Sequence, residues 1–174
     1  MKKEIILKQI IGFVFTGVFG VLLHFAYDWS GKNGIVAIFS GVNESTFEHM
    51  KLLFFPMLAF AFFEKRWIKR EMPNFYCIKL RGILLGLILI PVIFYTANGV
   101  VGKTPDWFNI LIFFISAAIV FIYETKLFQR NKPCRYPKAA KLVLLVLALA
   151  FAIFTFFPPP INLFRDPLTK LYGI

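Results

Sequence analysis

The chain of 174 residues is 59% hydrophobic and 18% aromatic, with 23 Phe and a formal net charge of +11 at pH 7. Ordinary soluble domains contain about 45–50% apolar residues, so a water-soluble fold of this length could not bury so much apolar surface. The length suits one domain over residues 1–174. The excess of basic residues would suit nucleic-acid binding or membrane topology, and their positions decide between the two.

Five apolar stretches approach or reach the length that a membrane-spanning helix needs. In chain order they are residues 10–27, 46–63, 82–97, 107–123 and 142–157. Helices are required because lipid cannot satisfy unpaired backbone groups, and the stretches are too uniform for the alternating strands of a barrel. We therefore predict an all-α integral membrane bundle of about five transmembrane helices.

Two further segments are apolar but do not cross the membrane. Residues 34–42 form a nine-residue run that is too short to span, so we expect a re-entrant or interfacial segment. After the last span, Pro158-Pro159-Pro160 ends the helix. The tail that follows, to residue 174, is expected to lie outside, either over the bundle or as an interfacial anchor.

Lysine and arginine are divided unevenly between the two ends of the predicted helices. Fifteen of the 20 fall on one side, namely Lys2, Lys3, Lys8, Lys65, Arg66, Lys69, Arg70, Lys79, Arg81, Lys126, Arg130, Lys132, Arg135, Lys138 and Lys141. That side also holds four acids, Glu4, Glu64, Glu71 and Glu124, and so carries a net +11. The other side holds five basic and five acidic residues, which cancel: Lys32, Lys51, Lys103, Arg165 and Lys170 against Asp28, Glu44, Glu48, Asp106 and Asp166.

By the positive-inside rule the basic side faces the cytoplasm. The chain is then a multi-pass protein of the cell membrane with its N-terminus inside and its C-terminus outside. Since the whole net charge is explained by topology, the reason to expect nucleic-acid binding disappears. Cys77 and Cys134 fall in the predicted cytoplasmic loops, where a reducing compartment predicts free thiols.

Polar residues gather at the predicted outer side, including both histidines of the chain. His24 and Asp28 are four apart on one helix, where a carboxylate can orient an imidazole; a structural hydrogen bond at a helix end is the other interpretation. Glu44, Glu48 and Lys51 are spaced to line one stripe of the second helix, and ionisable groups so near the hydrocarbon are functional candidates. Alternatively, Ser45 and Glu48 match a capping box.

These residues define the candidate site. As catalytic groups we predict His24, Asp28, Glu44, Glu48 and His49, and as ligand-binding groups Ser30, Asn43, Ser45 and Lys51. A metal interpretation takes His24, His49 and Glu48 as ligands for zinc or another divalent metal, because such mixed nitrogen and oxygen sets suit those ions. A nucleophile and base at Ser45 and His49 has no supporting elbow motif.

Three motifs carry a resemblance to a known family. They are His24-x-x-x-Asp28-Trp-Ser-Gly31, Val42-Asn-Glu-Ser-x-x-Glu-His-x-Lys51, and Leu163-Phe-x-Asp-Pro with the closing Tyr172-Gly-Ile174. With them the chain resembles a family of small bacterial polytopic membrane proteins of unknown function. It is more loosely similar to membrane hydrolases of the alkaline ceramidase kind, which place His and Asp around zinc, although it lacks their paired His near a late helix.

Three functional hypotheses follow. The leading one is an outward-facing polar pocket that binds a small molecule, a lipid or a metal, with hydrolysis at the membrane surface as the reaction if the protein is an enzyme. The second is a component for transport of a small solute or ion, which with five spans and no inverted repeat would need a partner or an oligomer. The third is a structural or accessory protein whose only partner is the lipid bilayer.

Overall fold

The computed structural model describes residues 2–67, 72–102, 104–130 and 132–174. For Asp106, within the third range, it describes the backbone only. Of the charge pattern above, Lys69, Arg70, Glu71 and Lys103 lie outside the described residues. The elements are α1 (Lys2–Trp29), α2 (Gly34–Ala37), α3 (Thr46–Trp67), α4 (Phe75–Val101), α5 (Asp106–Arg130), α6 (Pro137–Phe156) and the 3₁₀ turn η1 (Asn162–Phe164).

Five of these helices are long and apolar enough to cross a membrane, with a mean hydropathy of 1.3 to 2.5 in their best windows. Each covers its predicted span, except that α6 stops one residue early, at Phe156. Most of the helices extend beyond the apolar stretch, because the charged and polar residues at its ends can also adopt helical backbone hydrogen bonding. The described residues contain no β-strand, so the predicted all-α class is confirmed.

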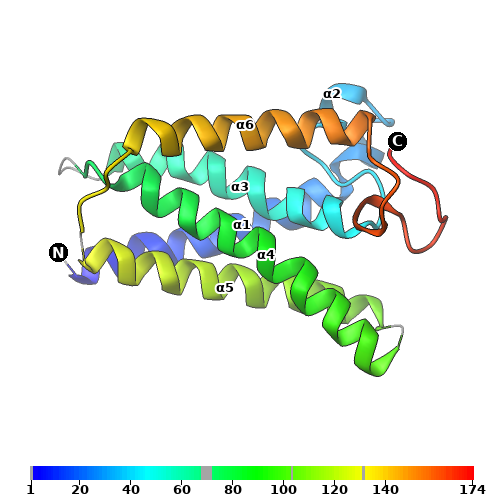
Figure 1. The fold of residues 1–174 in the computed structure, drawn as a ribbon, viewed down its shortest axis with the longest axis horizontal. Coiled ribbons are helices and arrows are strands. Elements are labelled where there is room, and N and C mark those ends of the chain that lie inside the picture. The colour runs from blue at the N-terminus through cyan, green and yellow to red at the C-terminus, as the bar shows by residue number, and fades with distance from the viewer. Residues whose placement is uncertain (1, 68–71, 103, 131) are drawn as a thin grey trace.

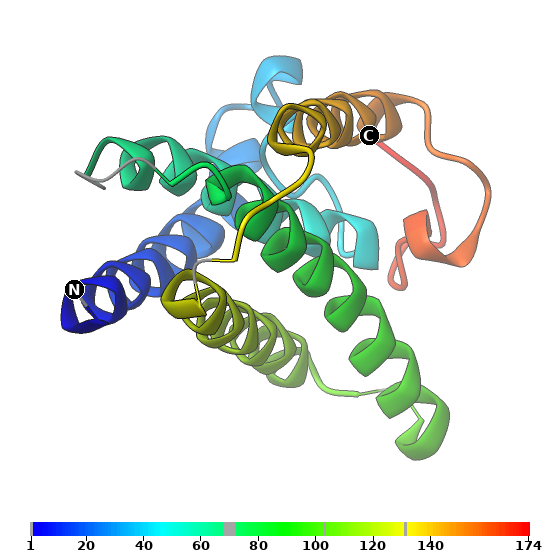
Figure 2. The same cartoon turned by 60° about the vertical axis from the view of Figure 1, so that its left-hand side comes forward.

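Helices α1, α3, α4 and α5 pack around one another, and α6 lies on the outside against α4 (Figures 1 and 2). The most buried helix is α3, with 61% of its spanning window inside the bundle, and it is also the least hydropathic. The two facts belong together, because polar side chains on α3 face protein instead of lipid. The core is largely aromatic around Phe54, Phe60, Phe113 and Phe121.

Glycines let the helices approach closely. A Cβ atom at Gly12 of α1 would lie 2.5 Å from ring atoms of both Phe60 and Phe121. At Gly20 it would lie 2.5 Å from the ring of Phe113 and 3.1 Å from the Leu52 carbonyl oxygen. Small residues have this role in many membrane bundles, where close contact takes the place of a hydrophobic driving force.

The two ends of the bundle differ. The start of α1, the end of α3, the start of α4, the end of α5 and the start of α6 lie together at one end, here called the basic end (Figure 1). The opposite end, here called the histidine end, carries α2, the C-terminal tail and both histidines. This sidedness agrees with the predicted grouping of charges.

Residues 34–42 lie at the histidine end and do not cross the bundle, as predicted. The Ser40 hydroxyl accepts a hydrogen bond from the Tyr27 amide at 2.8 Å and donates to the Leu23 carbonyl. The Gly41 amide donates to the same Leu23 carbonyl at 3.2 Å. The segment is therefore tied to the last turns of α1.

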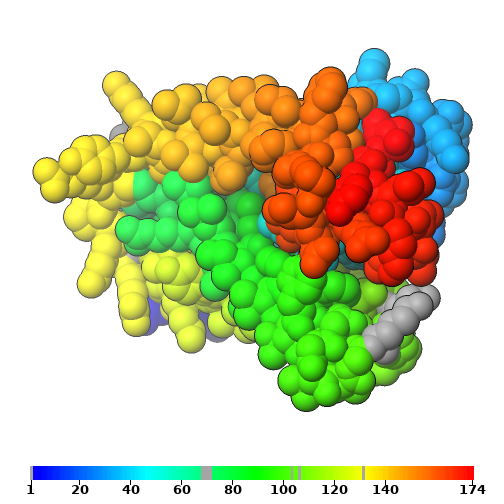
Figure 3. All heavy atoms as spheres, turned by 45° about the vertical axis from the view of Figure 1, so that its right-hand side comes forward, coloured from blue at the N-terminus to red at the C-terminus, as the bar shows by residue number. Residues whose placement is uncertain are grey.

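The C-terminal tail also folds back over the histidine end (Figure 3). Phe164 of η1 is buried, with its ring 4.5 Å from that of Phe47 and 5.6 Å from that of Phe154. The Asn43 amide group donates to the Gly173 carbonyl at 2.9 Å, which fastens the end of the tail to the loop before α3. Of the two predicted roles for the tail, the structure thus supports a cover over this end.

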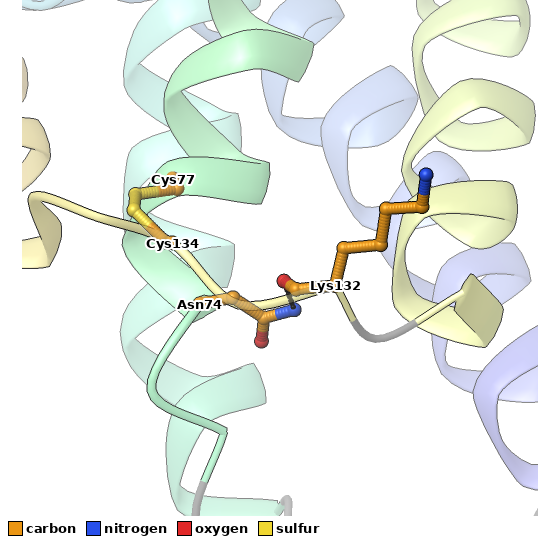
Figure 4. The surroundings of a disulfide bond; sticks show 4 residues. All are labelled: Asn74, Cys77, Lys132 and Cys134. Atoms are coloured by element: carbon orange, nitrogen blue, oxygen red, sulfur yellow. Dashed lines mark hydrogen bonds between the residues drawn. A yellow bond between two sulfur atoms is a disulfide. The ribbon is translucent and has the colours of Figure 1, made fainter.

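The cysteines correct a prediction. Cys77, in the first turn of α4, forms a disulfide with Cys134 of the α5–α6 connection, with a Cα–Cα distance of 6.3 Å (Figure 4). The Asn74 amide group also donates to the Lys132 carbonyl at 2.9 Å and holds the two segments together. The prediction of free thiols is wrong, because it was argued from the compartment, while the packing of residues 57 positions apart brings the two thiols into reach.

Candidate functional site

Three predicted residues come together at the histidine end and are called the histidine site. His24 lies near the end of α1, Glu44 in the loop before α3, and His49 in the first turn of α3. The Glu44 carboxylate lies between the rings, with one oxygen 3.5 Å from His24 Nε2 and the other 3.6 Å from His49 Nε2. Both distances exceed those of ordinary hydrogen bonds, so the three groups face one another without satisfying one another.

His49 is held in a defined orientation. Its Nδ1 lies 3.0 Å from the Ser45 carbonyl oxygen, which only accepts hydrogen bonds, so Nδ1 carries a proton. A neutral His49 then presents a bare Nε2 toward Glu44. Chemically, this nitrogen can accept a hydrogen bond or a proton from a bound group.

The histidine site opens into a cavity of about 430 Å³ between α1, α3, α4, α5 and the tail. Its walls are mostly apolar, and its lining includes Val21, Phe25, Leu52, Phe94, Ile110, Phe113, Phe114 and Leu168. Polar atoms come from the histidine site and from Asn98, Thr104 and Asn109. The cavity therefore has an apolar wall and a concentrated polar region.

Asn109 of α5 was missed by the sequence analysis, which treated its helix as plain hydrocarbon. Its Oδ1 atom is buried and has no hydrogen-bond partner among the described residues. By contrast, Asn98 Oδ1 accepts from the amide and hydroxyl of Thr104 at 3.1 and 3.2 Å. A lone amide in a spanning segment was the signal that could have singled out Asn109.

Asp28 is exposed, and within the described part of the chain no hydrogen bond or ion pair joins it to His24. The predicted pairing of His24 with Asp28 is therefore wrong. The partner is Glu44, because the loop before α3 returns over the last turns of α1 and brings a carboxylate from another segment. Glu44 also precedes α3, so it does not extend the stripe of Glu48 and Lys51.

Glu48 and Lys51 form a buried ion pair, called the clamp pair. Lys51 Nζ lies 2.6 Å from the Glu48 carboxylate, 2.8 Å from the Ala37 carbonyl and 3.0 Å from the Thr155 hydroxyl. The Glu48 carboxylate also accepts from the Val42 amide at 3.0 Å. These bonds join α3 to α2, its following loop and α6, and they place neither residue in the cavity.

Ser45 and Asn43 complete the start of α3. The Ser45 hydroxyl accepts from the Glu48 amide at 3.4 Å, which is half of the predicted capping box. The other half is absent, because Asn43 Oδ1 instead accepts from the Ser45 amide at 2.9 Å. Ser45 is fully buried and its hydroxyl is part of this cap, so it is not placed to attack a ligand in the cavity.

Ser30 ends α1. Its hydroxyl donates to the Tyr27 carbonyl at 2.8 Å and accepts from the Asn33 amide at 3.3 Å. None of the four predicted ligand-binding residues, Ser30, Asn43, Ser45 and Lys51, lines the cavity. Each forms hydrogen bonds that shape the histidine end.

The metal prediction receives no support. Across the described ranges, no group of three or more His, Cys, Asp or Glu side chains is arranged to hold a metal ion. Glu48, the predicted carboxylate ligand, is engaged by Lys51 and the Val42 amide. His24 and His49 remain together, but the third ligand needed for a typical zinc site is not supplied by Glu48.

A second buried ionic group lies near the basic end, and from sequence its members were counted only among the charges of the basic side. Lys79 Nζ lies 2.8 Å from the Glu64 carboxylate and 2.6 Å from the Glu124 carboxylate. All three side chains are at most 1% exposed. We call them the basic-end cluster. A signal was present in sequence: Glu64 and Glu124 each directly follow an apolar stretch, and Lys79, of opposite sign, lies three residues before one.

Five membrane-length helices, four of which surround a cavity with a polar region, define a multi-pass helical membrane protein. The chain belongs to a family of unknown function, DUF6512, whose model matches residues 1–174. This confirms the expectation of a family without an assigned function. No curated protein and no solved structure is significantly similar to the chain.

Proposed function

We propose that this membrane protein binds an amphipathic small molecule in the cavity at the histidine end. The observation that carries the proposal is the histidine site itself, in which Glu44 lies 3.5 and 3.6 Å from two ring nitrogens and makes a good hydrogen bond to neither. The cavity of about 430 Å³ is within the size range of small-molecule sites, which combine apolar walls with a few polar groups.

The polar region is rich in acceptors. The Glu44 carboxylate only accepts, and a neutral His49 offers a bare Nε2. Such a surface complements a head group that donates hydrogen bonds, and the negative charge of Glu44 favours a cationic one. The ligand class is therefore an alkyl amine or, with weaker binding, an alcohol, whose chain lies along the aromatic wall.

Binding of a dansyl-labelled medium-chain alkylamine to the detergent-purified protein tests this proposal, beside the matching alcohol and carboxylic acid. The amine should bind best and the acid worst. Glu44→Gln should weaken amine binding at least about tenfold, since a hydrogen bond to a charged group contributes about 1.5–3 kcal/mol. Asp28→Asn is the matched control, because Asp28 is exposed and outside the cavity.

Equal binding of amine and acid would contradict the proposed head-group chemistry. Unchanged amine binding in both Glu44→Gln and His49→Ala would remove the histidine site from the binding function. In either case, any ligand of the cavity would be bound without a contribution from the polar region.

Orientation is part of the proposal. The positive-inside rule supports a cytoplasmic basic end and an outward-facing cavity in the cell membrane. The Cys77–Cys134 disulfide argues the other way, because disulfides are rare in the reducing cytoplasm. We follow the basic residues, since their asymmetry involves every connection at that end.

Cysteine labelling in intact cells tests the orientation. In a Cys77→Ala, Cys134→Ala background, a membrane-impermeant maleimide should label Asn162→Cys and leave Lys126→Cys unlabelled. Both positions are exposed and lie at opposite ends of the bundle. The reverse labelling pattern would show the opposite membrane orientation, with the cavity facing the cytoplasm.

A further inference from the structure

The basic-end cluster is one positive charge short. Glu64, Lys79 and Glu124 bring two carboxylates to one ammonium group, and all three are buried. Around them Lys79 Nζ has the rings of Phe60, Phe121 and Phe128 at 5.8, 5.5 and 6.0 Å. An uncompensated charge in such surroundings is costly, so neutrality requires one more bound positive charge.

No other described group supplies that charge. On α1 the residue that reaches the cluster is neutral: Gln9 Nε2 donates to Glu64. The adjacent Lys8 bonds Glu4 and the Trp67 carbonyl, both at 2.8 Å. Among the described residues of α3, α4 and α5, the titratable groups of the cluster are therefore Glu64, Lys79 and Glu124.

The cluster also has unused acceptors. Glu124 Oε1 and Gln9 Oε1 are buried without a hydrogen-bond partner within the described ranges. Glu124 Oε1 lies against Gly82 of α4, where an added Cβ would collide with it. The carboxylate therefore packs directly on the helix backbone, and a proton is the smallest positive charge that its bare oxygen could bind.

A row of polar side chains, buried except for the half-buried His24 and Asn109, leads from the cluster toward the cavity. On α1 its members are Gln9, Thr16 and His24; on α5 they are Asn109, Ser116 and Glu124. Both sets have spacings of seven and eight residues, which keep them on one helix face. The two helices pack side by side (Figures 1 and 2) and run in opposite directions, so Gln9 and Glu124 lie at one end of their contact, His24 and Asn109 at the other, and Thr16 and Ser116 in between.

The middle of this polar row is unsatisfied. Thr16 and Ser116 are fully buried, and their hydroxyls have no partner among the described residues. Elsewhere in the chain, Thr125 and Thr155 donate to the carbonyl four residues earlier, at 2.7 and 2.9 Å, which is the common solution for a helical hydroxyl. Buried polar groups without partners are commonly satisfied by water.

We propose that the basic-end cluster binds one exchangeable proton and that the polar row along the α1–α5 seam is the route between the cluster and the cavity. The proton completes the charge of two carboxylates and one ammonium. Thr16 and Ser116 provide hydrogen-bonding positions in the middle of the route. This inference does not depend on the ligand proposed for the cavity.

Infrared spectroscopy of the full-length protein in detergent tests the proton. The parent at neutral pH should show the carbonyl stretching band of a protonated carboxyl group, and this band should shift in D₂O. Glu124→Gln or Glu64→Gln should remove it, whereas Glu48→Gln, in the clamp pair, should leave it in place. Absence of the band in the parent, which needs no variant, would overturn the proposal, as would its persistence in both cluster variants.

The same spectrum tests the competing cation and the route. Loss of the band when sodium chloride replaces choline chloride would identify a bound metal cation and overturn the proton assignment. Thr16→Val and Ser116→Ala should slow the D₂O shift several-fold without removing the band. Thr125→Val is the matched control, because that hydroxyl is bonded within its own helix. Unaltered exchange in both row variants would refute the route.

Discussion

The two buried ionic groups of this protein both combine lysine with glutamate, but they differ in the ratio of basic to acidic residues. In the clamp pair, Lys51 has three donor hydrogens and three acceptors, the Glu48 carboxylate, the Ala37 carbonyl and the Thr155 hydroxyl. One base meets one acid, and every donor has an acceptor. In the basic-end cluster, one base meets two acids, and Glu124 Oε1 has no partner within the described part of the chain.

This difference in charge ratio distinguishes a purely structural ion pair from a group that can bind a further cation or proton. A balanced and fully bonded pair gains nothing from a further ligand, and its bonds fasten α2 and α6 to α3. An unbalanced cluster with a free acceptor has a binding capacity built into its charge. The sequence alone does not reveal this difference, because in both groups it shows only a few charged residues near the ends of predicted helices.

The largest effect is expected when the clamp pair loses its cation. Lys51→Met leaves the Glu48 carboxylate buried without a counter-charge, which should lower the free energy of unfolding by about 3–5 kcal/mol. The midpoint of SDS-driven unfolding in mixed micelles measures it. Lys126→Met, at an exposed position of α5, is the control and should change little. Equal midpoints for both variants would show that the clamp pair has no structural role.

Neutralising one carboxylate should separate the two groups directly. Glu48→Gln leaves Lys51 without an anion, whereas Glu124→Gln leaves Lys79 paired with Glu64 at 2.8 Å. We expect the first variant to be less stable than the second by at least about 2 kcal/mol. The same unfolding assay decides it. If Glu124→Gln proves the more damaging, the basic-end cluster is the tighter structural unit and the contrast is reversed.

A smaller effect is expected from crowding the basic-end cluster. In Gly82→Ala the new Cβ would collide with Glu124 Oε1, so the carboxylate must shift away from Lys79 at a cost of about 1–3 kcal/mol. Gly99→Ala is the matched control on the same helix, with nothing within 4 Å of the added atom, and it should be neutral or stabilising. Equal stability of the two variants would mean that Glu124 can move freely.

The smallest effects compare two buried hydroxyls. Thr155→Val removes an acceptor from Lys51 and should cost about 1–3 kcal/mol, because a buried donor loses its partner. Thr16→Val replaces a hydroxyl that has no partner among the described residues and should cost less, because no protein group is left without its hydrogen bond. Thermal unfolding of the two variants in the same detergent provides the comparison. Equal destabilisation by Thr16→Val would reveal a side chain that this hydroxyl does bind.

Much of the candidate site was predictable, and the failures have a common cause. His24, Glu44 and His49 were all named from sequence because they are polar residues beside apolar stretches. The partner of His24 was misassigned to Asp28, four residues along the same helix, because spacing within a helix is the only proximity that a sequence displays. Glu44 reaches His24 through a loop, and that contact depends on how 34–45 folds back on α1.

Side-chain direction explains the remaining errors. Glu64, Lys79 and Glu124 were counted only among the charges of the basic side, yet their helices continue beyond the apolar stretches and rotate all three inward. Cys77 and Cys134 were predicted to be free thiols from the expected reducing compartment. The sequence does not show that these two residues, 57 positions apart, lie next to each other in the fold.

By itself, the sequence determined the all-α class, five helices of membrane length, their approximate limits and the division of charge between two ends. These follow from hydropathy and charge summed over local windows, and lipid imposes helix on any such window. Only the tertiary structure decided which faces meet: Glu44 between two histidines, Lys51 fully bonded, and Lys79 between two carboxylates. Such contacts join separate helices, and the packing of the whole bundle sets their rotation.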